Sequence, residues 1–561
     1  MFRPRFKGRL HRVRRYRHIV AVLMKYGLEE VAHGVRTRLA DRFGKARAPT
    51  VERAAVGHSR PARVRMALEE MGPTFVKFGQ LLSTRADLVS QEYIAELEKL
   101  QDQVKPEDPD RICAAIEREL GAGIMDLFKD FECTPLAAGS IAQVHRAWLK
   151  DGTAVVVKVR RPGIVEVIAA ECEIFRELAG ILQTTVLDNQ GLDYHQMAQD
   201  LTSAVLKETD LANERRNQLR FLQGFAQDPT VHVPRVYESH CAEAVLTMEF
   251  IDGIKPSPVE ALRLHGLDPK VVAQRGADFV LRQIFDMGFF HADPHPGNFF
   301  VLPGNVLAPI DFGQVATLPS QDRALFTEIL LAVVGNEARR IVSALDRADM
   351  LGEDTDSSRL CGEIELLIEA YRHLPLREIP FGQAMNRLFD LFRTHHVRPP
   401  AHIALMLKSL VTIEAFAKSL NPDFNIVETL TPYARKWAMS DLQPKRLWDH
   451  LRQGVRHLGD FTWQFPEDAN AVLRKLRQGK AQIRIHHEHL EYLTKTLDKS
   501  SNRISFSLII AALLVASSLL VPQEGKALGF ISLQTLGIAG YIFAAIIGIW
   551  LLVSILRSGR L

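Results

Sequence analysis

The order of hydrophobic and polar residues changes its period several times along the chain. In residues 61–104, apolar side chains recur at spacings of two to four, which predicts helix, and Gly72-Pro73 predicts a break within it. Strand-like runs follow from about Phe131, and Lys150-Asp-Gly152 between two of them predicts a hairpin turn. Helical spacing returns over residues 163–227, so helical segments flank a sheet-forming segment.

The second half of the chain is predicted to be largely helical. Val245 to Phe250 is a predicted strand, helical spacing dominates from Ala261 onward, and short strands are expected around Phe299 and Leu307. A strand-rich small lobe followed by a helix-rich large lobe predicts an α+β, two-lobed fold.

Two uncharged apolar runs lie near the C-terminal end of the sequence. As a helix, residues 504–521 would span about 27 Å, close to the thickness of a hydrocarbon core, and residues 536–556 form a similar run. We therefore predict a transmembrane helical hairpin, with a buried hairpin of a soluble core as the weaker alternative. Basic residues flank both runs, which predicts that both ends of the hairpin lie in the cytoplasm: Lys495, Lys499, Arg503, Arg557 and Arg560.

The charged segment from Pro466 to Arg503 carries apolar residues at helical spacing. Such a segment is expected either to lie along a membrane surface or to pack on the main body, and the sequence leaves both open.

Composition indicates a folded protein in a reducing compartment. The 561 residues exceed one ordinary core, so two or more units are expected, and a net charge of +4 with 24% charged residues fits folded domains. The five cysteines form no C-x-x-C pair, which disfavours a disulfide framework or a structural zinc site.

The first 18 residues are strongly basic, with seven Arg, one Lys and no acidic residue. A solvated arm, a contact with an anionic membrane and an Arg-rich transit peptide all fit this composition, and we favour the membrane contact because of the apolar C-terminal runs. Nucleic acid is not expected as a partner, since no DNA-binding motif or aromatic-interleaved basic surface accompanies the run.

Two motifs in the large lobe carry the chemistry. His291-Ala-Asp-Pro-His-Pro-Gly-Asn298 is followed twelve residues later by Ile310-Asp-Phe-Gly313. This pairing is typical of a kinase-type phosphotransfer site, in which one Asp lies near the reacting group while an Asn and a second Asp bind Mg²⁺. The sequence therefore predicts Asp293 as the catalytic residue, Asn298 and Asp311 as metal ligands, and a two-lobed protein-kinase-like fold.

A competing interpretation treats His291, Asp293 and His295 as a metal-binding cluster on one face of a strand. Pro294 and Pro296 disfavour a regular strand there. His291 is expected to be a structural residue that is hydrogen-bonded beneath the loop.

The small lobe supplies the candidate nucleotide contacts. Lys158 in a strand is predicted to contact phosphates and to pair with a helix Glu, the alternative being an exposed edge-strand Lys. A small-residue turn precedes it in the place of a phosphate-covering loop, but with one glycine instead of the usual three. The predicted cofactor-binding residues are Ala137, Ala138, Gly139, Ser140, Ile141, Ala142, Lys158 and Glu249.

These residues resemble the UbiB family of atypical kinase-like proteins, also called ABC1, over about residues 62–430. Four segments carry the resemblance: Gly72–Gln80 with Leu82–Asp87 (the family's KxGQ region), Ala137–His145 (its Ala-rich loop), Val157–Gly163 (its Lys strand), and Lys207–Glu214 with Asn217 (its ExD helix). The apolar runs resemble the C-terminal hairpin of bacterial members.

The resemblance implies further site residues. Lys77 and Gln80 would lie on a helical extension that covers the active site and obstructs protein substrates, with Lys77 near Glu208 and Asp210. Glu214 would be the partner of Lys158, with Glu208 as the second choice. Gly139 replaces an Ala found in much of the family, which leaves a preference for ATP or ADP open.

The expected organisation follows from these assignments. It comprises a basic segment (residues 1–60), a helical extension (61–130), a small lobe with a helical insertion (131–253), a large lobe (254–430), a helical linker (431–503) and the two apolar runs.

We expect a kinase-like ATPase that binds Mg²⁺ with ATP and supports ubiquinone biosynthesis at the bacterial inner membrane, with the kinase-like domain and both termini in the cytoplasm. The expected partners are membrane lipid, prenylated phenol or quinone intermediates and quinone-biosynthesis enzymes, and a homodimer is left open. The alternatives are a protein kinase acting in trans, a kinase of small molecules or prenyl lipids, and a nucleotide-gated scaffold.

Overall fold

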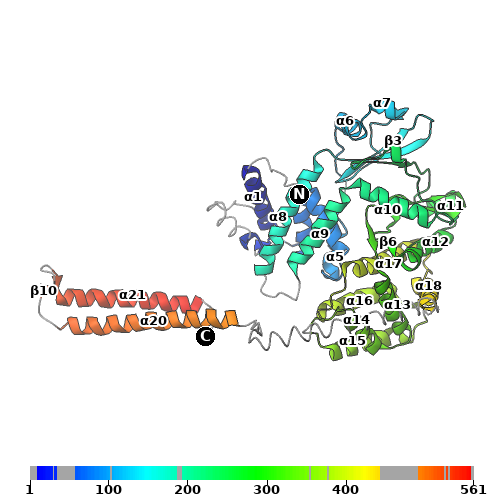
Figure 1. The fold of residues 1–561 in the computed structure, drawn as a ribbon. Coiled ribbons are helices and arrows are strands. Elements are labelled where there is room, and N and C mark those ends of the chain that lie inside the picture. The colour runs from blue at the N-terminus through cyan, green and yellow to red at the C-terminus, as the bar shows by residue number, and fades with distance from the viewer. Residues whose placement is uncertain are drawn as a thin grey trace, which may run out of the picture. The chain divides into compact units, whose positions relative to one another are not determined.

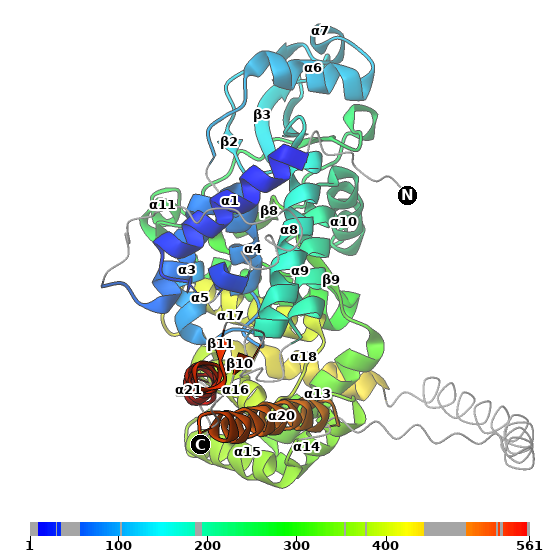
Figure 2. The same cartoon turned by 90° about the vertical axis from the view of Figure 1, so that its left-hand side faces the viewer.

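The computed structural model is shown in two orthogonal views in Figures 1 and 2. The structure describes residues 9–29, 31–34, 57–100, 104–185, 193–352, 355–375, 378–441, 490–522, 526–527 and 531–557. The chain divides into two compact units, residues 1–448 and 449–561.

A five-stranded antiparallel sheet forms the small lobe. Its central strands run in the order β1, β3, β4, β5, with β2 also paired to β3. The predicted hairpin turn is confirmed, because Asp151 accepts a hydrogen bond from the Thr153 amide (2.9 Å) and Gly152 has a φ of 88°. The strands are β1 Asp130–Phe131, β2 Ala137–Ala138, β3 Ala142–Trp148, β4 Ala154–Arg160 and β5 Val245–Glu249.

One face of this sheet is covered by α6 (Pro109–Leu120) and α7 (Ile124–Leu127). Ile112 and Ile116 of α6 are fully buried against the valines of β4, which alternate with the cleft-facing Val156 and Lys158. Burial of branched side chains on one face therefore sets which face of β4 presents Lys158.

A helical layer joins the N-terminal extension to the insertion of the small lobe. It contains α1 Arg9–Lys25, α3 Arg60–Met71, α4 Pro73–Ser83, α5 Gln91–Leu97, α8 Ile164–Thr185, α9 Tyr194–Glu208 and α10 Leu211–Gly224. Figure 2 shows α1, α3 and α4 alongside α8 and α9, and their buried side chains form one hydrophobic cluster.

Gly72 makes the predicted break between α3 and α4. Its φ of 108° is a backbone conformation that favours glycine, and Pro73 then begins α4. The break turns α4 so that Phe75 and Phe78 are buried while Lys77 and Gln80 reach the cleft described below.

Part of the N-terminal segment packs on the protein, while the membrane contact of its basic residues stays a prediction. Part of it forms α1, in which Tyr16, Ile19 and Leu23 are buried against the helical layer. Arg15 donates to the Met71 carbonyl (2.5 Å) and to Glu171 (2.6 Å). The apolar half of the segment therefore packs on the protein; residues 1–8 and 35–56 lie outside the described residues.

The large lobe is mostly helical, as predicted. Its helices are α11 Val259–Leu264, α12 Pro269–Arg282, α13 Ser320–Val334, α14 Ala338–Arg347, α15 Ser357–Arg372, α16 Phe381–Thr394, α17 Ala401–Leu420 and α18 Ile426–Asp441. A short π-turn, η2 Gln283–Met287, follows α12, and 3₁₀ turns occur at η3 Pro296–Asn298 and η4 Pro303–Asn305. A further 3₁₀ turn, η1 Glu238–His240, precedes β5 in the small lobe.

Two short antiparallel strand pairs frame the catalytic motifs. The predicted strands around Phe299 and Leu307 are confirmed as β7 (Phe299–Leu302) and β8 (Val306–Pro309). The pair of β6 (Phe289–His291) with β9 (Val315–Thr317) was not predicted, because three-residue strands are too short for a periodic signal.

The second unit is a helical hairpin of α20 (Leu490–Leu520) and α21 (Leu533–Arg557), with β10 (Lys526–Ala527) paired to β11 (Ile531–Ser532) at the turn. Gly540 of α21 directly faces Ser517 of α20, where a larger side chain would clash. A small residue at this position therefore permits close packing of the two helices.

The prediction of transmembrane spans is not supported. Crossing a bilayer takes about 20 consecutive, mainly apolar residues, and no helix in the described part of the chain offers such a stretch. Residues 504–521 and 536–556 thus form a helical hairpin but are not identified as spans. Residues 442–489, which include most of the predicted linker, lie outside the described residues.

Candidate active site

A cleft of about 1150 Å³ separates the small-lobe sheet from the large lobe. It is lined by β3, β4, the segment after β5, and both motifs of the large lobe, with α4 and α5 of the extension along one side. Its volume is somewhat above the range of about 300–1,000 Å³ that is usual for small-molecule sites.

Lys158 of β4 lines this cleft. Its Nζ is 2.7 and 2.8 Å from the two carboxylate oxygens of Glu214 on α10, and 3.8 Å from Oδ1 of Asp311. Glu214, and not the alternative Glu208, is therefore the partner of Lys158.

Asn298 and Asp311 lie side by side because a backbone ladder joins their segments. The β7–β8 pairing continues through a hydrogen bond from the Ile310 amide to the Asn298 carbonyl (2.9 Å), and Asp311 follows directly. The side-chain nitrogen Nδ2 of Asn298 donates to the Asp293 carbonyl (3.2 Å). The side-chain oxygen of Asn298 is therefore the group available to bind a cation. An amide oxygen and a carboxylate are ligands that Mg²⁺ accepts, with substrate phosphates and water completing the shell.

The Asp-Phe-Gly turn is held by contacts from α10 and by a hydrogen bond within the turn itself. Phe312 is fully buried with its ring 5.2 Å from that of Phe221 on α10. Asn217 of the same helix donates to the Phe312 carbonyl (3.0 Å), and the Gly313 amide donates to Asp311 (3.0 Å). Helix α10 thus positions both the partner of Lys158 and the second candidate metal ligand.

The charges of this group are strongly coupled. Burial alone would lower the pKa of Lys158, but the attraction of Glu214 and Asp311 outweighs it and raises that pKa. Burial would raise the pKa of Asp311, yet Lys158, His291 and the Gly313 amide together hold it well below its usual value. Burial raises the pKa of Glu214, against the opposing effect of Lys158. Asp311 therefore stays a carboxylate at neutral pH, as a ligand for a cation must.

His291 is a structural residue, as expected. It is 1% exposed, its Nδ1 accepts from the Asp293 amide (3.0 Å), and burial lowers its pKa. Nδ1 as acceptor leaves the proton of the neutral ring on Nε2. The competing metal cluster does not form: over the described ranges, no three His, Cys, Asp or Glu residues are arranged to hold a metal ion.

The Ala-rich turn lies over one wall of the cleft. The Gly139 amide donates to the Ala142 carbonyl (3.0 Å), and Arg161 Nε donates to the Gly139 carbonyl (2.8 Å). These bonds close the turn between β2 and β3. Of the six residues predicted here, the cleft is lined by Ala137, Gly139, Ser140, Ile141 and Ala142.

Glu249 ends β5 where the chain passes to the large lobe. Its carboxylate accepts from His232 Nε2 (3.0 Å) and from the Arg235 amide (3.0 Å). The side chain of Glu249 is thus already engaged, although the residue lines the cleft.

The extension brings Lys77 and Gln80 to the cleft. Lys77 is buried, and its Nζ is 2.5 Å from Glu208 at the end of α9. Gln80 donates to the Leu100 carbonyl (3.1 Å). Asp210 instead caps α10 by accepting from the Ala212 amide (3.0 Å). Of the two acids assigned near Lys77, Glu208 forms the ion pair and Asp210 serves the helix terminus.

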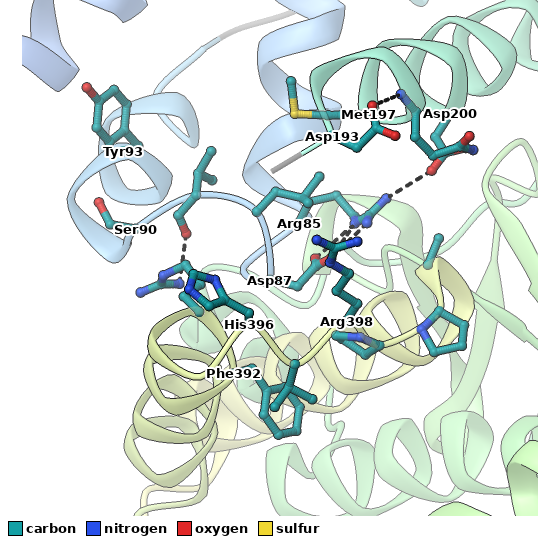
Figure 3. Close-up of a pocket in the computed structure, with 18 residues that line it drawn as sticks. Arg85, Asp87, Ser90, Tyr93, Asp193, Met197, Asp200, Phe392, His396 and Arg398 are labelled. Carbon is teal, nitrogen blue, oxygen red and sulfur yellow. Dashed lines mark hydrogen bonds and ion pairs between the residues drawn. The ribbon is translucent and has the colours of Figure 1, made fainter. Parts of the chain in front are cut away.

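The extension is also fastened to the large lobe, beside a second cavity of about 560 Å³ (Figure 3). Arg393 of α16 donates to the Ala86 and Val89 carbonyls (2.6 and 3.0 Å). Arg85 pairs with Asp87 (2.7 Å) and lies 3.9 Å from Asp200 of α9. The loop between α4 and α5 is therefore anchored to both lobes.

Sequence reasoning missed four ionisable residues of the cleft, Glu98, Asp252, Lys255 and Lys408, and two of them lie near Asp293. Lys408 of α17 lies 3.9 Å from Asp293, and Glu98 follows α5. Desolvation raises the pKa of Glu98, with Lys408 opposing and Asp293 adding to the shift. Lys408 is 115 positions from Asp293, so no local motif could have connected them.

Three family descriptions match the chain. They are the ABC1 atypical kinase-like domain over residues 99–345, the UbiB helical domain over 364–425, and the ABC1/UbiB kinase-like C-terminal domain over 488–557.

Curated relatives match nearly the full length. A "Probable protein kinase UbiB" of Aeromonas hydrophila is 32% identical over 520 residues, covering 91% of this chain and 94% of that protein. The protein of the same name from Cellvibrio japonicus is 33% identical over 508 residues, covering 88% and 91%. An "Uncharacterized protein in hydrogenase 1 5'region" of Clostridium pasteurianum is 32% identical over 506 residues, covering 89% and 94%.

Proposed function

This chain belongs to the ABC1/UbiB family of atypical kinase-like proteins, and from that premise we propose that it is a Mg²⁺- and ATP-dependent ATPase that supports ubiquinone biosynthesis at the bacterial inner membrane. A kinase-like domain implies nucleotide binding. The choice of ATP, of hydrolysis and of the quinone pathway is the proposal.

One observation carries the catalytic part of the proposal: Lys158, Asn298 and Asp311 meet in a single cleft. Their positions suit a nucleotide whose phosphates contact the Lys158 ammonium, with Mg²⁺ held by Asn298 and Asp311. Bound Mg²⁺ would neutralise phosphate charge. Asp293 would orient the attacking oxygen, and Glu214 would keep Lys158 in place.

The covering extension favours a small acceptor or water over a protein substrate. Lys77 and Glu208 form an ion pair at the cleft, and Arg393 fastens the adjoining loop to the large lobe. A protein chain would have to displace these contacts before it reached Asp293. This arrangement supports hydrolysis as the basal reaction.

The helical hairpin supports a membrane location. Both helices expose large apolar side chains, among them Leu508 (72% exposed) and Ile546 (60%). Exposed apolar surface of this extent is typical of a contact with lipid or protein. We propose lipid, with the kinase-like domain on the cytoplasmic side where ATP is available, and with prenylated phenol or quinone intermediates and quinone-biosynthesis enzymes as partners.

The proposal is tested by ATP turnover of the purified full-length protein on anionic liposomes, with and without a prenylated phenol. We expect slow Mg²⁺-dependent hydrolysis that Asp311→Asn abolishes, and loss of ubiquinone in cells that carry this variant. Normal ubiquinone content with Asp311→Asn at wild-type abundance would overturn the proposal.

The same assay separates the alternatives. Transfer of phosphate to an added protein would identify a protein kinase acting in trans, the activity named for several relatives. A phosphorylated prenylphenol would identify a small-molecule or lipid kinase. Nucleotide binding without turnover, together with rescue of ubiquinone synthesis by Asp293→Asn, would identify a scaffold.

A further inference from the structure

Lys408 brings a positive charge to Asp293 from a helix outside the two catalytic motifs. Its Nζ lies 3.9 Å from Oδ1 of Asp293, and its side chain is only 18% exposed. Within the part of the chain that the structure describes, this ammonium has no hydrogen-bond partner, although it carries three donors. A mostly buried ammonium in this state is well placed to receive an anionic ligand.

The orientation of α17 is set by polar contacts on either side of Lys408. The adjacent Ser409 donates its hydroxyl to the His291 carbonyl (2.9 Å), and His402 pairs with Asp322 of α13 (2.9 Å). Thr412, one turn beyond Lys408, lines the same cleft. The rotation of α17 therefore directs Lys408 toward the catalytic loop.

The other lysines that line the described cleft are already bound. Lys158 is shared by both oxygens of Glu214, and Lys77 pairs with Glu208. Lys255 donates to the Gly297 carbonyl (2.7 Å). None of them offers three unengaged donors near Asp293.

The charge balance beside Asp293 requires a cation when phosphate is present. Lys408 lies 3.9 Å from Asp293, and Glu98 lines the same cleft. Desolvation raises the pKa of Glu98, while the charge of Lys408 lowers it and that of Asp293 raises it further. Without Lys408, the terminal phosphoryl group would meet two carboxylates. Negative charge at the transferring group is a main obstacle to phosphotransfer, and preplaced cations lower it most effectively in a partly dehydrated cleft.

We propose that Lys408 is a catalytic residue whose ammonium contacts the terminal phosphoryl group of the nucleotide and stabilises its charge during transfer. The proposal rests on the nucleotide chemistry given above as the proposed function.

In the step that Lys408 assists, the attacking oxygen of water forms a bond to the terminal phosphorus. The bond from that phosphorus to the bridging oxygen breaks, and its electron pair stays on the departing nucleoside diphosphate. Asp293 orients the water, whose proton passes to the carboxylate or to the phosphate product. Lys408 forms no covalent bond and remains protonated throughout.

The test compares Lys408→Met with Lys408→Arg and with the matched control Lys436→Met in the full-length protein. Lys436 is 74% exposed and lies 3.8 Å from Asp286, away from the cleft. We expect Lys408→Met to lower kcat about 10²-fold with less than about a threefold change in KM, because the contact strengthens in the transition state. Lys408→Arg should recover part of the loss, and Lys436→Met should match the wild type.

A binding measurement keeps the test independent of turnover. With Mg²⁺, ADP and aluminium fluoride as the transition-state analogue, Lys408→Met should lose about 10²-fold in affinity, against less than about threefold for a non-hydrolysable ATP analogue. Equal losses for both ligands, or wild-type kcat, would overturn the role of Lys408 while the proposed ATPase stands. Absence of nucleotide binding by the wild type would overturn both.

Discussion

Lys158 and Glu214 are 56 positions apart in sequence, yet the Lys158 ammonium contacts both carboxylate oxygens of Glu214, at 2.7 and 2.8 Å. The Glu214 side chain is 4% exposed. A buried pair of this kind adds little net stability, but loss of one partner leaves an uncompensated charge in the protein interior.

This pair gives the first prediction. Lys158→Met should destabilise the protein by about 3 kcal/mol, whereas the double variant Lys158→Met with Glu214→Met should be more stable than the single variant, because the buried Glu214 carboxylate is no longer left without its partner. Urea unfolding of the three proteins measures the difference. If the double variant loses as much stability as Lys158→Met, or the sum of the two single losses, the two charges are not coupled as the geometry indicates.

The second prediction concerns pH. His145 is 1% exposed, and burial lowers its pKa below the ordinary 6.5. Between that lowered pKa and pH 6.5, the unfolded chain binds a proton at His145 that the folded protein does not bind. The stability that comes from neutral, buried His145 is therefore fully present above pH 6.5 and is lost as the pH falls.

Each such histidine adds a slope of up to about 1.4 kcal/mol per pH unit, and His291 acts in the same direction. His145→Gln should remove one of these two slopes in urea unfolding between pH 7 and pH 5. An unchanged slope would contradict the buried neutral state of His145.

The third prediction concerns the fastening of the extension. Arg393→Met removes the donors to the Ala86 and Val89 carbonyls and should cost about 1–3 kcal/mol, since those acceptors lose their partner. Amide hydrogen exchange should become faster in α4 and α5. The control is Arg372→Met, whose side chain is 55% exposed and pairs only with Glu369 on its own helix in the described contacts. If amide hydrogen exchange in α4 and α5 is equally fast in the two variants, Arg393 does not fasten the extension to the large lobe.

The fourth prediction concerns the hairpin. Leu508→Glu with Ile546→Glu should lower the partition of the protein into anionic vesicles by at least about tenfold, because two exposed apolar side chains no longer enter lipid. Vesicle flotation measures the partition. The matched control Leu366→Glu replaces a side chain that is 71% exposed on α15 of the main body. If the control loses as much affinity as the double variant, the hairpin is not the lipid contact.

Local features were predictable because neighbouring residues encode them. The Lys150–Gly152 turn, the break at Gly72 and the strand that carries Lys158 all depend on backbone preferences and on the period of buried side chains. The two motifs of the large lobe were likewise visible, since each is a short continuous segment.

Other features depend on packing between distant segments. For the N-terminal basic run the sequence favoured a membrane contact, and it gave no sign that the apolar face of α1 is buried against α3 and α8. The membrane prediction likewise rested on the hydropathy of the two runs, and none of the described helices is both long and apolar enough to cross a bilayer. Asp210 matched a family motif, but as the N-cap of α10 it satisfies a backbone amide of that helix.

By itself the sequence determined the residue types of the site, since Asp293, Asn298 and Asp311 lie in recognisable short motifs whose spacing reflects local backbone geometry. Only the tertiary structure decided between the possible partners, Glu214 for Lys158 and Glu208 for Lys77, and brought Lys408 to Asp293. The reason is physical. An ion pair across more than fifty residues depends on the rotation and placement of whole helices, and these are set by the summed burial of the core rather than by the residues that form the pair.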